Sequence, residues 1–213
     1  PPRERLRKAS QGGVLLFRPR KRRPTLYQSV LADAGLYGLL LRLDQDLART
    51  AQEQRCGRCG GRLDRADYAR KPRGVPLGLA PEHAVRLSFC CAAEGCRRRT
   101  TPASVRFLGR RVYVGAAVVG ITALGEGTPR SEVRILRAWL GLSARTLARW
   151  RRWWRSAFAA SAFWRGSRGQ LRAPIPVGAL PGGLLQRFAG DLRARLIAGL
   201  RFLSPITTSA AAM

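Results

Sequence analysis

Acidic side chains are scarce in this 213-residue sequence, which has 12 Asp and Glu residues against 40 Lys and Arg residues. The net charge is +28, and nearly all of the base is arginine, since only Lys8, Lys21 and Lys71 are lysines. A chain with this imbalance repels itself unless a polyanion lies nearby. Nucleic acid is the first candidate polyanion, and an anionic membrane surface is the second.

Histidine is scarcer still, because His83 is the only one in the chain. The acids are scattered along the sequence, and no nucleophile lies beside a candidate base in any recognisable pattern. Acid–base and nucleophilic catalysis both need such groups close together. We therefore predict that the protein is not an enzyme.

Long apolar runs are absent. The longest, residues 114–124, has 11 residues, whereas a helix needs about 20 to span a bilayer. We expect no transmembrane helix and no membrane partner. No secretory signal is visible, and five cysteines, an odd number, suit a reducing interior with a metal site better than a disulfide framework. These features predict a cytoplasmic, nucleoid-associated protein, with oligomers as an open option.

The positive charge is concentrated in one part of the chain. Residues 97–173 contain 17 arginines and two glutamates, a net charge of +15. Residues 1–24 form a second basic segment that ends in RPRKRR (18–23). This segment is either a solvated tail or an arm that follows phosphates or a minor groove.

The spacing of apolar residues predicts a mainly α fold with a small β zinc ribbon: a three-helix unit containing a helix-turn-helix, with packing helices at both ends of the chain. Thr25 is expected to cap the first helix. Ser131 and Ser143 are expected to cap the two helices of the helix-turn-helix, and the helix capped by Ser143 should end near Phe158. In chain order we expect a basic arm (1–24), an N-terminal helix (25–50), a zinc ribbon (51–112), a helix-turn-helix unit (113–164), a linker (165–183), and a C-terminal amphipathic helix (184–203) with a tail to residue 213.

Short segments punctuated by Gly, Pro and Cys set residues 56–112 apart. The stretches VRLSF (85–89) and SVRFL (104–108) alternate between apolar and polar residues, which predicts strands. So few apolar side chains cannot bury much area, and a β unit of this size usually needs a covalent or metal staple.

The cysteine spacing supplies such a staple. Cys56 and Cys59 form a CxxC pair followed by glycines, and Cys91 and Cys96 form a second pair with four residues between them. Four thiolates from two turns make a closed tetrahedral zinc site, which is structural because it leaves no open position for a substrate.

The identity of the third ligand is open on spacing alone. Cys90 is an alternative to Cys91, although Cys91 is favoured if it shares a strand face with Leu87 and Phe89. His83 is an alternative fourth ligand in a Cys3His site, although a loop histidine without a role is the simpler interpretation.

A helix, a tight Gly-Leu-Ser turn and a second helix are predicted over residues 131–155, whose sequence is SEVRILRAWLGLSARTLARWRRWWR. Leu147, Trp150 and Trp154 recur at helical spacing and should pack inward. Arg145, Arg149 and Arg152 recur on another face of the same helix, which is typical of a helix that enters the DNA major groove. Ser143, Arg145 and Thr146 stand at the N-terminal end, which usually meets base edges.

The ribbon cysteines, the segment RRRTTPASVRFLGRRVYV (97–114) and the helix-turn-helix together resemble the zinc-ribbon and helix-turn-helix modules of insertion-sequence transposases and related mobile-element proteins. The resemblance covers about residues 56–155. It implies zinc at the four cysteines named above and DNA contacts from the basic residues that follow, with these candidates: Arg97, Arg98, Arg99, Arg110, Arg111 and the stripe from Arg145 to Arg152.

The chain departs from that family in its acids. Such transposases carry a catalytic acidic triad, whereas only Glu126, Glu132 and Asp191 follow the ribbon here. Two-metal chemistry needs clustered carboxylates. We therefore expect a zinc-dependent protein that binds specific sites on double-stranded DNA, as an accessory or regulator. The alternatives are an RNA or ribonucleoprotein component, and an interaction subunit that docks a transposase or another protein.

Overall fold

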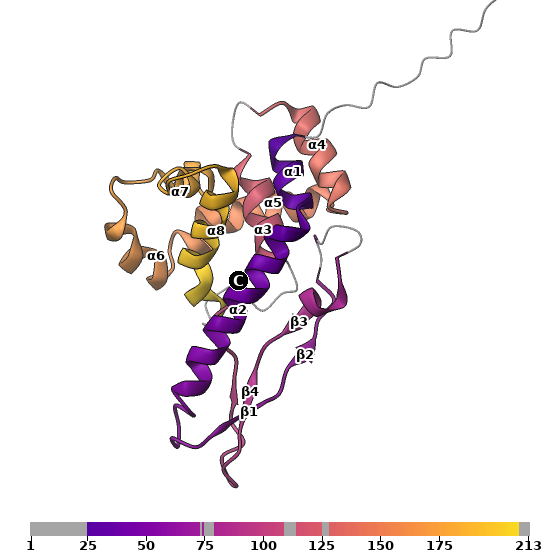
Figure 1. Cartoon of the computed structure of the whole chain (residues 1–213). Coiled ribbons are helices and arrows are strands. Elements are labelled where there is room, and N and C mark those ends of the chain that lie inside the picture. The colour runs from indigo at the N-terminus through magenta and orange to yellow at the C-terminus, as the bar shows by residue number, and fades with distance from the viewer. Residues whose placement is uncertain (1–24, 73, 75–78, 109–113, 125–127, 209–213) are drawn as a thin grey trace, which may run out of the picture.

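Figure 1 shows the computed structural model of the chain, which describes residues 25–72, 74, 79–108, 114–124 and 128–208. Most of these residues are helical, and short antiparallel strands form a small unit below the helices. The predicted mainly α fold with a small β unit is therefore confirmed. The predicted basic arm (1–24) and the candidates Arg110 and Arg111 lie outside the described residues.

The N-terminal helix begins after Thr25, as predicted. Thr25 Oγ1 accepts the amide of Gln28 at 3.2 Å, and Gln28 Oε1 accepts the amide of Thr25 at 2.9 Å. The expectation of one helix over 25–50 is wrong, because the segment forms α1 (Leu26–Ala32) and α2 (Ala34–Glu53). Asp33 has an extended backbone between them, and its carboxylate caps α2 by accepting the amide of Gly35.

α3 (Gly115–Ala123) lies at the centre of the helical core. Its residues 115–122 are all buried, as expected for an apolar helix without a polar face. α1, α5, α7 and α8 pack against it. Gly120 permits the close approach of α1, since a Cβ at this position would lie 3.1 Å from Leu31 Cδ1.

α4 (Arg130–Trp139) and α5 (Ala144–Trp153) are joined by a tight turn at Gly141, which has a φ of +63°. Such a left-handed backbone favours glycine. Ser143 caps α5 as predicted, because its Oγ accepts the amide of Thr146 at 3.1 Å.

Two details of these helices differ from the prediction. Ser131 does not cap α4, because the helix begins two residues earlier than predicted, at Arg130 after Pro129, and no side-chain hydrogen bond caps it. The helix predicted to run to Phe158 is α-helical only to Trp153 and continues as a π-helical turn, η2 (Trp154–Phe158).

The C-terminal part covers one side of α3. The segment predicted as a linker (165–183) lies within a series of short helices: α6 (Ala162–Ser167), η3 (Arg168–Gln170), η4 (Val177–Ala179) and α7 (Gly182–Leu185). The single helix expected over 184–203 is wrong. The chain turns at Gly190, where φ is +94°, and α8 (Leu192–Leu203) then begins with Asp191 as its cap. A short helix η5 (Ser204–Thr207) follows.

The β unit has two small antiparallel sheets. β1 (Leu63–Arg65), β4 (Phe89–Cys91) and β5 (Arg99–Thr100) form one, in the order β1-β4-β5, with Leu63 opposite Cys91 and Phe89 opposite Thr100. β2 (Tyr68–Ala69) and β3 (Val85–Arg86) form the other, and a short helix η1 (Pro81–Ala84) precedes β3. The strand predicted over 85–89 is therefore divided between the two sheets.

The strand predicted over 104–108 is wrong. Within the described residues this segment makes one isolated bridge, between Phe107 and Val114. Its backbone is held by a side chain instead: Asp44 of α2 accepts the amide of Val105 at 2.7 Å and the hydroxyl of Ser104 at 2.6 Å. An amide that already donates to a carboxylate cannot also donate to a neighbouring strand, so this segment does not join a sheet.

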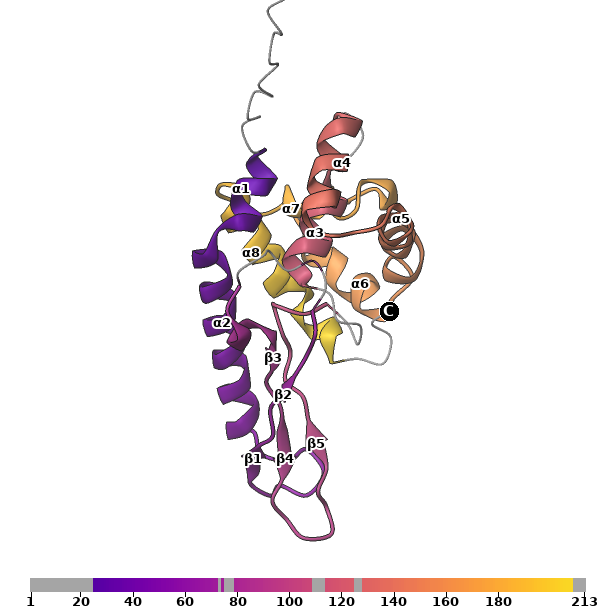
Figure 2. The same cartoon turned by 90° about the vertical axis from the view of Figure 1, so that its right-hand side faces the viewer.

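α2 joins the two parts of the molecule, as Figures 1 and 2 show. Its first half buries Leu36, Tyr37 and Leu40 in the helical core. Its second half lies against the β unit, where Ala48 packs in the ribbon core and Gln52 Nε2 donates to the carbonyl of Leu63 at 3.0 Å. The ribbon is therefore held at a fixed place beside the helical body.

Candidate metal centre and candidate nucleic-acid interface

Four cysteines come together beside the paired strands β1 and β4. The Sγ atoms of Cys56, Cys59, Cys91 and Cys96 all lie within 4.8 Å of one another. The Cys56 and Cys96 sulfurs are 3.8 Å apart, and those of Cys59 and Cys91 are 3.4 Å apart. Four sulfurs around one zinc ion at about 2.3 Å would stand about 3.8 Å from each other. The group fits a tetrahedral metal ion.

Tight turns bring each cysteine pair to this place. In the first turn the Gly60 amide donates to the Cys56 carbonyl at 2.8 Å, and the Cys56 amide donates to the Gly61 carbonyl at 3.0 Å. In the second turn the Cys96 amide donates to the Ala93 carbonyl at 3.1 Å. Gly60 and Gly95 have left-handed backbones, with φ of +69° and +81°, which a β-carbon would strain.

Gly61 lies directly against the sulfurs. A Cβ at this position would lie 3.0 Å from the Cys91 sulfur and 3.2 Å from the Cys59 sulfur. The space beside the sulfurs is therefore available only because residue 61 has no side chain.

Cys91, and not Cys90, belongs to the group. Phe89 and Cys91 are buried on one face of β4, while Cys90 is half-buried on the other and its thiol donates to the Arg97 carbonyl at 3.2 Å. Alternation along a strand is the physical reason. His83 is not in the group either, because it lies in η1 with its ring edge-on to Tyr37, 6.5 Å between centroids.

The environment of the sulfurs favours a bound cation. Amides of Arg58 and Cys59 donate to the Cys56 sulfur and lower its pKa to about 6. The Ala93 amide acts on Cys91 in the same direction, but burial and the neighbouring sulfurs outweigh it and raise the pKa of Cys91 to about 12. Four thiolates this close repel one another, and a divalent cation removes that repulsion.

The arginines after Cys96 have different surroundings. Arg97, Arg98 and Arg99 are all exposed. Arg99 is held by the ribbon itself, since its Nη1 donates to the Ala66 carbonyl at 2.9 Å and to Ser88 Oγ at 2.7 Å, and its guanidinium lies over the Tyr68 ring. Its guanidinium therefore stabilises the ribbon, whatever else it contacts.

α5 has two distinct faces. Leu147, Trp150 and Trp154 are buried in the helical core, and Trp154 Nε1 donates to Thr122 Oγ1 of α3 at 2.9 Å. The predicted stripe lies on the outside: Arg145, Arg149 and Arg152 are exposed. Ser143 and Thr146 stand at its N-terminal end, where their hydroxyls hydrogen-bond to each other at 3.0 Å.

A groove of about 680 Å³ lies between α4 and α5 and was not predicted from the sequence. Its lining includes six arginines, three from α4 and three from α5 and η2: Arg130, Arg134, Arg137, Arg151, Arg152 and Arg155. The spacing of the first three along α4, at i, i+4 and i+7, places them on one helix face and was visible in the sequence. Only Arg152 also belongs to the predicted stripe.

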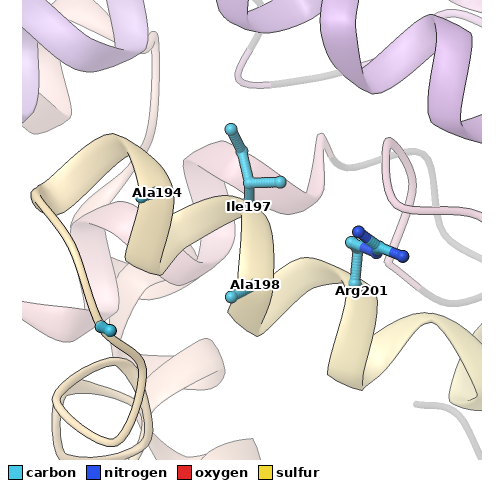
Figure 3. Close-up of a pocket in the computed structure, with 5 residues that line it drawn as sticks. Ala194, Ile197, Ala198 and Arg201 are labelled. Carbon is cyan, nitrogen blue, oxygen red and sulfur yellow. The ribbon is translucent and has the colours of Figure 1, made fainter.

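A second hollow lies beside α8 and is shown in Figure 3. Ile197 and Arg201 project from the helix, with Ala194 and Ala198 between and beside them. Arg201 is the one ionisable side chain among the described residues that line it.

Comparison with known proteins gives no relative: no family model, curated protein or solved structure matches this chain. The resemblance to transposase modules therefore stays a prediction. Within the described residues no helix combines the length and the apolar character needed to cross a membrane.

Proposed function

We propose that this chain is a zinc-binding protein that binds double-stranded DNA at specific sites, with α5 as the helix that meets the base edges. The proposal retains the role predicted from the resemblance, an accessory or regulatory protein related to transposase modules. The observation that carries it is the division of α5 into a buried apolar seam and an exposed arginine stripe.

Two arginines of the stripe, Arg145 and Arg152, contribute little to folding. Among the described residues, no ion pair uses Arg145 or Arg152, because the acids that pair with arginine lie elsewhere, as with Asp33 and Asp46. Exposed like charges on one helix face repel one another. A guanidinium can bind guanine O6 and N7 with two hydrogen bonds, so the same stripe suits base recognition in the major groove.

Zinc is the metal that best fits four thiolates in a closed group. Cys56, Cys59, Cys91 and Cys96 would hold it, and with no open position it would act as a structural ion that supplies no catalysis. The ribbon core beside it is small, with Leu63, Leu87 and Phe89 as its largest apolar side chains. A core of this size gains much of its stability from the metal.

Selection from a random duplex library, at low and at moderate salt, tests the DNA proposal. We expect one enriched motif, weakened by Arg145→Gln with Arg149→Gln and retained by Arg165→Gln with Arg168→Gln, a control pair of exposed arginines on α6 and η3 that removes the same charge. Binding without an enriched motif contradicts site-specific recognition. Preference for structured RNA over duplex DNA in competition overturns the proposal.

Metal analysis of the purified protein tests the zinc proposal separately. We expect about one zinc per chain, lost in Cys59→Ser, together with weaker DNA binding if the ribbon supports the interface. Wild-type protein without zinc after purification in metal-containing medium contradicts it.

A further inference from the structure

The groove between α4 and α5 is a strongly charged concave surface, lined by six arginines. We infer that it binds successive phosphate groups of one DNA strand, while the stripe of α5 faces the bases. This inference rests on the proposed DNA binding and adds a second, sequence-independent contact surface to it.

Both helices direct arginines into the same groove. Arg130, Arg134 and Arg137 line it from α4, spread over about 10 Å of helix axis at about 1.5 Å per residue. Arg151, Arg152 and Arg155 line it from α5 and η2. The groove is therefore long enough to contact more than one phosphate of a DNA strand.

Among the described residues, no acidic side chain lines this groove. The acid of α4, Glu132, lies on another side of the helix, where its charge acts on Tyr27 of α1. The repulsion among the six guanidinium groups is therefore not offset by any carboxylate in the lining, and a bound anion would offset it. Planar guanidinium groups bind phosphate oxygens through paired hydrogen bonds.

The floor of the groove is short and apolar. Val133, Ala144, Leu147 and Ala148 form it, and Ser156 is the one uncharged polar residue among the described residues of the lining. Alanine at two of these positions lets a backbone come close to α5, and the floor offers no pattern of donors and acceptors that would read a base. The surface therefore suits the part of DNA that every sequence shares.

Arg152 links the groove to the stripe, since it lines the one and belongs to the other. A duplex that presents base edges to Arg145 and Arg149 must pass its sugar-phosphate backbone along the same helix. This continuity favours a DNA strand over an acidic peptide as the occupant of the groove.

The test compares three variants in DNA binding measured over a range of salt. The groove variant is Arg130→Gln, Arg134→Gln, Arg155→Gln, chosen because all three side chains are exposed. The stripe variant is Arg145→Gln, Arg149→Gln. The charge-matched control is Arg165→Gln, Arg168→Gln, Arg172→Gln, which removes three exposed arginines from the region of α6 and η3. Circular dichroism and thermal unfolding check that each variant is folded.

Three lost phosphate contacts reduce the slope of log K against log salt by about 2.7. When salt rises from about 50 to about 200 mM, the affinity of both proteins for DNA falls. The factor by which it falls should be about 40 times smaller for the groove variant than for wild type. The groove variant should also bind all duplex sequences more weakly by a similar factor and keep the wild-type motif. The stripe variant should lose the motif, and the control should keep both the motif and the wild-type slope.

Two results overturn the inference while leaving DNA binding in place: a groove variant with the slope of the control, or one that changes the preferred motif. A third result also overturns the inference. If a short acidic peptide displaces DNA from the wild type but not from the groove variant, and the groove variant keeps the wild-type salt slope, the groove binds a protein partner. Wild-type protein that binds no duplex contradicts the proposed function itself.

Discussion

Asp44 and Arg106 form an ion pair inside the molecule, with 2.8 Å between Oδ2 and Nε and side-chain exposures of 1% and 3%. Asp44 belongs to α2, and Arg106 belongs to the segment between the ribbon and α3. The Arg106 guanidinium also donates to the carbonyls of His83 and Val85, at 3.1 and 2.8 Å. A single buried pair therefore ties the long helix, the ribbon and the helical core together.

Asp44→Asn should destabilise the protein by about 3–5 kcal/mol, because it leaves the Arg106 charge buried without a counter-charge. Urea unfolding followed by circular dichroism measures the loss. Asp46→Asn is the matched control, since Asp46 pairs with Arg49 at 3.5 Å on the exposed side of the same helix. An exposed pair contributes about 0–1 kcal/mol, so equal effects of the two substitutions would contradict the role of the buried pair.

Cys91→Ser should abolish zinc binding, whereas Cys90→Ser should retain it. The two cysteines are neighbours on β4, but only the Cys91 sulfur lies in the four-sulfur group. Zinc content per chain, measured by mass spectrometry after gel filtration, distinguishes the two variants. Retention of zinc by Cys91→Ser with loss in Cys90→Ser would mean that β4 presents its other face to the metal.

Gly61→Ala should weaken zinc binding at least tenfold, because the new methyl group would lie 3.0 Å from the Cys91 sulfur and 3.2 Å from the Cys59 sulfur. Gly57→Ala adds the same methyl group to the same turn, where it would meet nothing within 4 Å. Competition with a chromophoric chelator gives the two affinities. Similar zinc affinities in both variants would show that residue 61 has room for a side chain.

Short-range patterns predicted the parts of the structure that short-range forces determine. Thr25 and Ser143 were recognised as helix caps because a hydroxyl binds the amide three residues later in the same segment. Cys91 was preferred to Cys90 because side chains alternate along a strand, and Phe89 marks the buried face. In each case the interacting groups lie within a few residues of one another.

Long-range contacts decided the parts that the patterns missed. Residues 104–108 alternate like a strand, but their polar groups bind Asp44, about sixty residues earlier in the chain. The arginine groove depends on how α4 and α5 are placed beside each other, and neither helix alone specifies that.

The hydrogen bond from Trp154 Nε1 to Thr122 Oγ1 is buried and joins η2 to α3. Thr122→Val keeps the size of the side chain but leaves the indole N–H without its acceptor, which should cost about 1–3 kcal/mol of unfolding free energy. Thr50→Val is the matched control. The Thr122 hydroxyl donates to the carbonyl of Val118, four residues earlier, and the hydroxyl of Thr50, an exposed residue of α2, donates in the same way to the carbonyl of Asp46. Chemical denaturation followed by tryptophan fluorescence measures both variants. The control should lie within about 0.5 kcal/mol of wild type. An equally small effect of Thr122→Val would mean that the indole finds another acceptor, and that packing alone holds η2 against α3.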